Sequence, residues 1–199
     1  MYSQVGPSLG IRPPIRSDYR AWVSLRAASV ELHRPWEPWP YVVPTRESFR
    51  AQLDKYAYFL FRLEDDRLVG QCNVNLLVRG PFQNAALGYW TGAPFTGRGY
   101  MTEGVRLVLR ECFTTLKLHR VEANIIPQNN ASLSVARKNG FRHEGFSPRF
   151  LQIGGQWRDH ERFAMTLEDW QGLEGRNEGS TVHSRQSTVF DCRKLDVEE

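Results

Sequence analysis

A short glycine-containing stretch, residues 94–103, restricts the possible folds more than any other part of the chain. It reads Pro-Phe-Thr-Gly-Arg-Gly-Tyr-Met-Thr-Glu and follows an apolar, aromatic run at residues 87–90. After it, apolar residues recur at helical spacing, at Met101, Val105, Val108, Cys112 and Leu116. The pattern therefore predicts a strand, a glycine loop and a helix. Such a junction offers the free N–H groups of a helix start, and the positive end of its dipole, to an anion such as a phosphate.

Neither of two common phosphate-binding loops matches this stretch. The GxGxxG loop of dinucleotide-binding proteins would need glycine at the position of Thr102. The P-loop needs Lys and then Ser or Thr after its second glycine, but Val105 and Arg106 follow Gly104. Because a Gly-x-Gly also occurs in ordinary tight turns, the ligand has to be inferred from the rest of the chain.

The patterns on both sides of the glycine loop predict an α/β protein with a mixed sheet. Strands are expected at residues 9–12, 58–63, 68–78, 85–91, 120–126, 141–153 and 156–166, and helices at 17–32, 45–56, 101–116 and 130–139. Thr45 is a suitable N-cap for the second helix, and Gly140 lies where a C-terminal cap is expected. Gly154 and Gly155 are typical of a two-residue hairpin turn.

The composition predicts one domain followed by a polar tail. With 199 residues, 41% of them hydrophobic, the chain can bury one core. We expect the domain at residues 1–170 and a disordered or docked tail at residues 171–199, where glycine and polar residues dominate. No run of about 18 apolar residues and no signal-peptide pattern occurs, which predicts a soluble, cytoplasmic protein. The three cysteines are far apart and suggest no metal site.

A tryptophan-rich segment, residues 33–40, is the second candidate for a binding region. It contains three prolines, which disfavour regular structure, together with Trp36, Glu37 and Trp39. Large aromatic side chains in a loop are often a binding surface. The alternative is that both tryptophans close the edge of the core.

Several motifs together resemble the GNAT superfamily of N-acetyltransferases, and within it the RimJ/RimL-type ribosomal-protein-alanine acetyltransferases. The resemblance covers roughly residues 9–170. It rests on the segments 35–38, 87–90, 97–99, 129–132, 140–141 and 154–160. It implies the GNAT acyl-CoA N-acyltransferase fold, with about seven strands, about four helices and a wedge between two splayed strands. Acetyl-CoA is the implied cofactor.

The resemblance also implies which residues bind acetyl-CoA. The family loop, Gln/Arg-x-x-Gly-x-Gly/Ala, matches at Gly97 and Gly99 but has Pro94 at its first position. Loss of that side chain matters little if backbone N–H groups hold the pyrophosphate. The implied cofactor-binding residues are Leu87, Tyr89, Trp90, Gly97, Arg98, Gly99, Tyr100, Met101, Asn129 and Ser132.

Catalysis requires an uncharged amine, a stabilised oxyanion and a proton for the departing thiolate. Many family members donate this proton from a tyrosine, but the corresponding position here is Ala136. Ser132 lies one helical turn earlier on the same face, and the resemblance to RimL-like enzymes implies that it is the proton donor. For the general base, Glu122 and Glu37 remain open alternatives, and Asn124 occupies the position of a catalytic Glu in some relatives. Because an α-amine has a pKa near 7.7–8.0, a modest base acting through water suffices.

The predicted function is transfer of acetyl from acetyl-CoA to the N-terminal α-amine of a ribosomal or other protein, directly in a ternary complex. Trp36, Glu37 and Trp39 are the predicted acceptor-binding residues. A small-molecule amine, such as an antibiotic or polyamine, is the alternative acceptor. A non-enzymatic module that docks on RNA or the ribosome is the third hypothesis, because the chain has a net charge of +4. We expect a monomer or homodimer that binds neither membranes nor DNA.

Overall fold

The computed structural model describes residues 1–38 and 44–185, with side chains up to residue 176. The chain divides into two units, residues 1–167 and 168–199, and each is described by itself. No described helix is both long and apolar enough to cross a bilayer.

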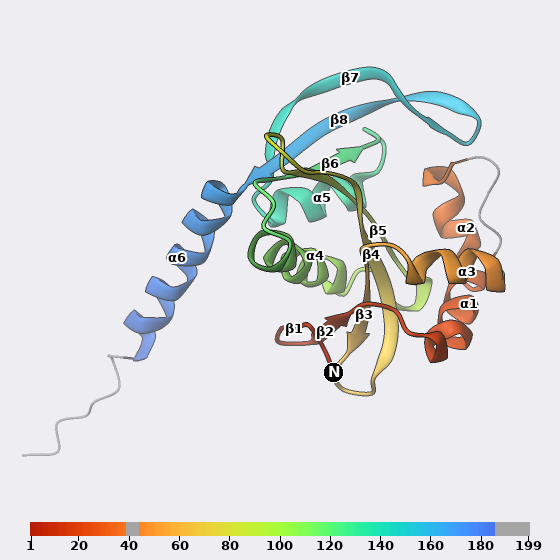
Figure 1. Ribbon diagram of the computed structural model, residues 1–199, viewed down its shortest axis with the longest axis horizontal. Helices are drawn as coiled ribbons and strands as arrows, with labels where there is room; N and C mark the ends of the chain where they lie inside the picture. The colour runs from red at the N-terminus through yellow and green to blue at the C-terminus, as the bar shows by residue number, and fades with distance from the viewer. Residues whose placement is uncertain (39–43, 186–199) are drawn as a thin grey trace, which may run out of the picture. The chain divides into compact units, whose positions relative to one another are not determined.

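One mixed sheet of eight strands forms the centre of the first unit (Figure 1). Its strands are β1 (Gln4–Val5), β2 (Leu9–Arg12), β3 (Ala57–Arg62), β4 (Arg67–Val78), β5 (Asn84–Thr91), β6 (Arg120–Ile125), β7 (Arg142–Ile153) and β8 (Gln156–Thr166). The order across the sheet is β1-β2-β3-β4-β5-β6-β8-β7, and every neighbouring pair is antiparallel except the parallel pair β5 and β6. The seven predicted strands are confirmed, while the two-residue β1 is additional.

Five α-helices belong to this unit: α1 (Tyr19–Ala27), α2 (Val30–His33), α3 (Arg46–Leu53), α4 (Tyr100–Arg110) and α5 (Asn130–Lys138). Thr45 caps α3 as predicted, because its Oγ1 accepts a hydrogen bond from the Ser48 N–H at 3.1 Å. The helix predicted at residues 17–32 is instead divided between α1 and α2. Ser29 lies at the break, where its hydroxyl donates to Leu25 O and accepts from the Ala93 N–H. This tertiary contact explains the break.

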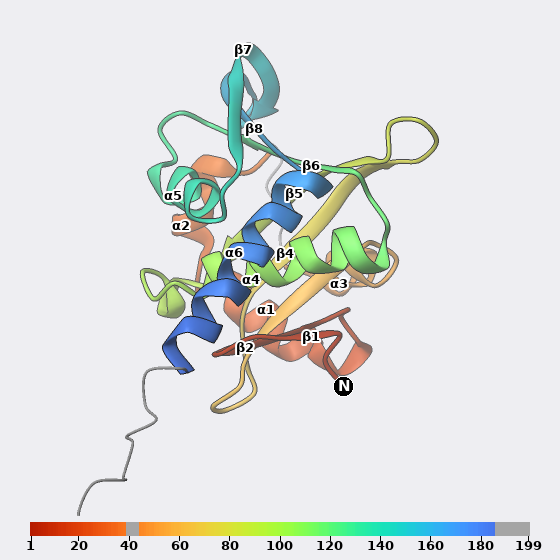
Figure 2. The same ribbon diagram turned by 90° about the vertical axis from the view of Figure 1, so that its left-hand side faces the viewer.

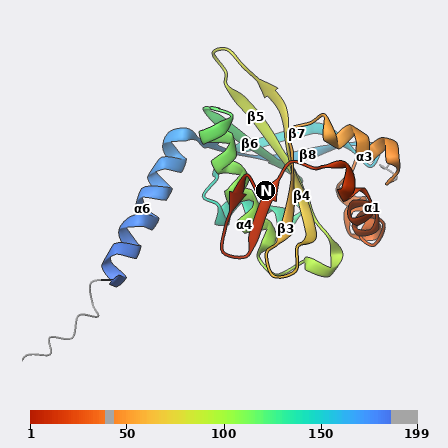
Figure 3. The same ribbon diagram turned by 60° about the horizontal axis from the view of Figure 1, so that its bottom comes forward.

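The helices cover both faces of the sheet, with α1 and α3 on one side and α4 on the other (Figures 2 and 3). On the α1 side, Trp22 Nε1 donates to Gln71 Oε1 of β4, and Gln71 Nε2 donates to Gln52 of α3. On the α4 side, a Cβ at Gly104 would lie 2.1 Å from Leu60 Cδ2 of β3. Only glycine therefore allows α4 to pack this closely on the sheet.

The sheet is split where β5 and β6 diverge. These strands pair only between residues 84–86 and 120–122, and after that β5 remains bonded to β4 while β6 remains bonded to β8. The free edge of β5, residues 87–91, therefore leaves backbone N–H and C=O groups without a strand partner on one side. This is the wedge implied by the family resemblance.

The β7–β8 hairpin extends from the sheet to the segment that follows α2 (Figure 1). Its turn has positive φ at both Gly154 (59°) and Gly155 (80°), as the sequence predicts for a two-residue turn. The Gly154 N–H donates to the Glu37 carbonyl at 3.0 Å. The hairpin is thus bonded to the segment that carries the predicted acceptor-binding residues.

The second unit contains α6 (Leu167–Arg185). Residues 171–185, which the sequence assigned to a disordered or docked tail, thus belong to a helix. The remainder of that predicted tail lies outside the described residues.

Candidate active site

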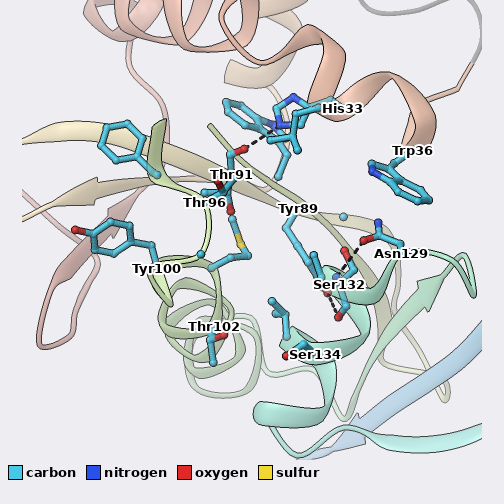
Figure 4. Close-up of a pocket in the computed structure, with 18 of the residues that line it drawn as sticks. His33, Trp36, Tyr89, Thr91, Thr96, Tyr100, Thr102, Asn129, Ser132 and Ser134 are labelled. Carbon is cyan, nitrogen blue, oxygen red and sulfur yellow. Dashed lines mark hydrogen bonds between the residues drawn. The ribbon is translucent and has the colours of Figure 1, made fainter. Parts of the chain in front are cut away.

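A cavity of about 530 Å³ lies in the region where β5 and β6 separate (Figure 4). Four segments provide most of its lining: β5, the glycine loop with the start of α4, the segment from α2 to residue 38, and α5 with the residue before it; Asn73 of β4 also contributes. The predicted cofactor-binding residues that line it are Tyr89, Trp90, Gly97, Gly99, Tyr100, Met101, Asn129 and Ser132. Leu87 and Arg98 are not among the lining residues: Leu87 is buried, and Arg98 is exposed on the loop.

The glycine loop provides a cradle made of backbone. Gly97 and Gly99 have φ angles of 73° and 80°, in the left-handed region, and a Cβ at either position would meet no atom within 4 Å. Gly99 is the N-cap of α4, so the first N–H groups of this helix have no partner within the helix. Pro94, which departs from the family pattern, is exposed and does not line the cavity. The loop therefore fits a phosphate group without that side chain.

The start of α5 fixes Ser132 by its backbone. Asn129 caps the helix, with its Oδ1 accepting a hydrogen bond from the Ser132 N–H at 3.1 Å. The Tyr89 hydroxyl of β5 donates to the Ser132 carbonyl at 3.3 Å (Figure 4). Both backbone groups of Ser132 are thus held by residues that line the cavity. Burial raises the pKa of Tyr89, which keeps its hydroxyl protonated.

The side chain of Tyr89 has a role that the sequence did not predict, because only the backbone of this residue was expected to contact the cofactor. Its side chain instead bridges β5 and α5. Ala136, at the position where the family resemblance implies a tyrosine in other members, is buried at 1% exposure one turn after Ser132. The feature of the sequence that comes nearest to predicting this contact is the combination of a small residue, Ala136, on α5 with a tyrosine, Tyr89, on β5.

A second wall of the cavity, here called the acceptor wall, contains Trp36, Glu37 and Trp90. Two of the three predicted acceptor-binding residues, Trp36 and Glu37, therefore line the same cavity as Ser132. The third, Trp39, lies outside the described residues.

Arg26 of α1 lies behind this wall and was not predicted from the sequence. It is 7% exposed, and its guanidinium donates to Glu37 Oε1 at 2.5 Å and to His33 Nδ1 at 2.8 Å. The same group lies 5.0 Å from the centre of the Trp90 ring, in cation–π geometry. A buried charge is costly unless it is paired, and Arg26 is paired.

His33 connects Arg26 to β5. Its Nε2 lies 2.9 Å from the Thr91 carbonyl, which can only accept, while its Nδ1 faces the Arg26 guanidinium, which can only donate. His33 is therefore the neutral tautomer with the proton on Nε2. Burial lowers the pKa of His33, which agrees with this assignment.

Acidification should destabilise the protein in part through His33. Because its native pKa lies below the ordinary value of 6.5, its neutral form stabilises the fold fully above pH 6.5. This contribution is lost as the pH falls from 6.5 through the lowered native pKa. Urea unfolding from about pH 7 to pH 5 should show a shallower pH dependence for His33→Asn than for the wild type. His160, whose pKa is also lowered by burial, is present in both proteins. Equal slopes would contradict the assignment.

Glu122, the other predicted base, is not among the residues that line the cavity. Its two carboxylate oxygens accept hydrogen bonds from Arg120 and Arg162, each at 3.0 Å. The neighbouring Asn124 also bonds to Arg162. The position of Glu122 on β6 thus connects it to a charged network rather than to the cavity. Its catalytic role stays a prediction from the sequence.

Two buried cysteines lie on the α4 side of the sheet. Burial raises the pKa of Cys72 well above its ordinary value, and that of Cys112 to about 12. Neither lines the cavity. These properties do not favour an acyl-cysteine route, and direct transfer stays a prediction from the sequence.

Comparison with known proteins defines the class of this protein. Residues 8–142 match the family model described as an acetyltransferase (GNAT) domain. The chain therefore belongs to the GNAT acetyltransferases, an acetyl-CoA-dependent family of enzymes.

Individual relatives refine this class. The chain is 32% identical over 148 residues, covering 69% of this chain and 76% of the relative, to the [ribosomal protein uS5]-alanine N-acetyltransferase of Escherichia coli (strain K12). It is also 40% identical over 116 residues to the probable N-acetyltransferase YjcK of Bacillus subtilis (strain 168). The matched region covers 58% of this chain and 64% of that protein. The structure of Mycobacterium smegmatis RimJ in complex with CoA-disulfide superposes with a TM-score of 0.73 at 32% identity, covering 81% of this chain and 83% of that one.

Acetyl-CoA is thus the cofactor, and the cavity fits it. The open space at Gly97 and Gly99 leaves room for the pyrophosphate at the start of α4. The free edge of β5 would hold the pantetheine arm by backbone hydrogen bonds. Asn129 and Ser132 lie at the wall formed by α5, where the arm would pass.

Proposed function

We propose that this protein acetylates the N-terminal α-amine of a protein. The observation that carries the proposal is the single carboxylate, Glu37, among the described residues that line the cavity. A protein N-terminus brings one ammonium group to such a site, whereas a polyamine brings several. The E. coli relative, named for alanine acetylation of ribosomal protein uS5, supports a protein acceptor of the same class.

Residues on the two sides of the cavity have distinct roles in this proposal. Bound acetyl-CoA supplies the acetyl thioester. Glu37 binds the acceptor amine and takes its proton, directly or through water. Ser132 Oγ donates a hydrogen bond to the departing sulfur and passes its proton to it while taking one from water, so that CoA leaves as the thiol and the serine ends neutral. The backbone bonds of Ser132 to Asn129 and Tyr89 keep the serine at the wall of the cavity while its side chain remains available.

The small-amine alternative depends on charge. A polyamine carries at least two ammonium groups and is bound best by several carboxylates. In the described part of the cavity wall, the one acidic side chain already pairs with Arg26, and Lys138 adds a positive charge. This balance disfavours a polycationic acceptor.

A screen of acceptors read by thiol release tests the proposal. Peptides with a free N-terminal alanine should be acetylated with a kcat/KM at least about tenfold above that of spermidine, since one mispaired charge costs about this much. The same peptides with a blocked N-terminus, but with an internal lysine, are the matched control and should be inactive. Turnover of spermidine or of blocked peptides at the rate of free peptides would contradict the proposal. Salt-dependent RNA binding without any turnover would instead favour the docking module.

A further inference from the structure

We propose that Arg26 is a positioning residue that holds Glu37 at the cavity and, by its charge, selects the uncharged form of the acceptor amine. The inference rests on the proposed function, since it concerns the acceptor of that same site. Arg26 itself is not among the residues that line the cavity and acts through Glu37.

The first step is geometric. Arg26 on α1 bonds to Glu37 in the segment after α2, and through His33 to the Thr91 carbonyl at the end of β5. The guanidinium thereby holds Glu37 directly and, through His33, connects it to β5, which is 58 residues from His33 in the sequence. Because β5 also carries the free edge for the cofactor, Arg26 sets the position of Glu37 relative to the acetyl group.

The second step concerns the oxygens of Glu37. Arg26 donates a hydrogen bond to Glu37 Oε1, whereas Glu37 Oε2 accepts no hydrogen bond from the described part of the chain. The Glu37 side chain is 21% exposed, whereas that of Arg26 is 8% exposed. The pair therefore presents one carboxylate oxygen toward the cavity and keeps its positive partner behind the wall.

The third step is electrostatic. With the Arg26 charge beside it, Glu37 attracts a second cation less strongly than a lone carboxylate would. The other titratable groups near this wall do not restore a negative charge, because His33 is neutral and Lys138 of α5 is basic. Arg34 pairs with Glu31 on α2, where both side chains are exposed. The pair therefore stabilises the ammonium form of the acceptor less than a lone carboxylate would, which leaves more of the amine in the uncharged form that can attack a carbonyl.

A comparison of four full-length variants tests this inference: Arg26→Gln, Arg26→Lys, Glu37→Gln and the double variant Arg26→Gln/Glu37→Gln. Arg26→Gln should lower kcat/KM for a free N-terminal peptide by about ten- to hundredfold, because misplacement of a catalytic group by about 1 Å has effects of this size. It should also move the rise of the pH–rate profile upward by about one unit, since one neighbouring positive charge is lost. The preference for peptide over spermidine should fall.

Arg26→Lys is the matched control, because it keeps the charge but cannot bridge His33 and Glu37 in the same way. It should lower kcat while the pH–rate profile stays in place. In the double variant, the loss should not exceed that of Glu37→Gln alone, because Arg26 acts through Glu37. Binding of acetyl-CoA, measured by calorimetry, should be unchanged in all four proteins.

Several results would overturn the inference. These are an unshifted pH–rate profile in Arg26→Gln, a shifted profile in Arg26→Lys, or losses that multiply in the double variant. If Arg26→Gln does not fold, the Arg26→Lys profile still decides, because the retained charge requires an unshifted curve. Absence of amine acetylation by the wild type would contradict the proposed function itself. A wild type that acetylates peptides, with an Arg26→Gln variant that behaves identically, would contradict only the role of Arg26.

Discussion

Gly99→Val should abolish acetyl-CoA binding while leaving a folded protein. Gly99 has a φ of 80°, a conformation that costs a residue with a Cβ about 1–2 kcal/mol and a β-branched residue more. Relief of this strain would turn the N–H groups at the start of α4 away from the pyrophosphate. If the loop keeps its shape, the valine side chain enters the open space that the glycine leaves for the cofactor. Either outcome removes the backbone cradle.

Calorimetric titration with acetyl-CoA measures this effect, and we expect affinity to fall by at least about a hundredfold, or about 2.7 kcal/mol. Gly80→Val is the matched control. Gly80 has a φ of 71°, and a Cβ there would meet no atom within 4 Å, so its backbone strain is comparable. It lies in the turn between β4 and β5 and does not line the cavity. Wild-type affinity in Gly99→Val would refute the role of the loop.

Ser132→Ala should lower kcat by about a hundredfold or more with little change in acetyl-CoA affinity. Loss of a positioned proton donor has effects of about 10²–10⁴-fold. The substitution is informative because the bonds that position this residue come from its backbone, to Asn129 and to Tyr89. These bonds persist in the alanine variant, so the change removes the hydroxyl and little else.

Steady-state kinetics with a peptide acceptor, together with calorimetry, separate the chemical step from binding. Ser134→Ala provides the comparison, because Ser134 also lines the cavity from α5 but lies two residues further along the helix. Its effect on kcat should be much smaller. Wild-type kinetics in Ser132→Ala, or equal losses in the two variants, would remove Ser132 from the mechanism.

The glycine loop illustrates how far a local pattern extends. Gly97, Gly99 and the apolar spacing after them predicted a strand, a loop and a helix, and the structure contains β5, this loop and α4. These features depend on backbone conformation and on helical periodicity, both of which are written in neighbouring residues. Alternation and turn residues located the other main strands for the same reason.

The division between α1 and α2 could not be predicted in this way. The sequence at residues 17–32 has helical spacing, but Ser29 bonds to Ala93, which lies 64 residues further along the chain. A contact over that distance overrides local propensity. The pairing of Glu122 with a charged network could not be predicted for the same reason, because its partner Arg162 is on β8, 40 residues away.

The amino-acid sequence by itself determined the main strands, the glycine loop and the family, because each is marked by motifs whose residues are close together in the chain. The tertiary structure alone decided which charged groups act together at the acceptor wall. Arg26 on a helix is typical of an exposed surface, and no neighbouring residue marks it as buried. It becomes buried because the folded chain brings Glu37 and the His33–Thr91 pair to it, 11 residues away in one case and linked across 58 residues in the other. Pairing of a buried charge is a property of the assembled fold.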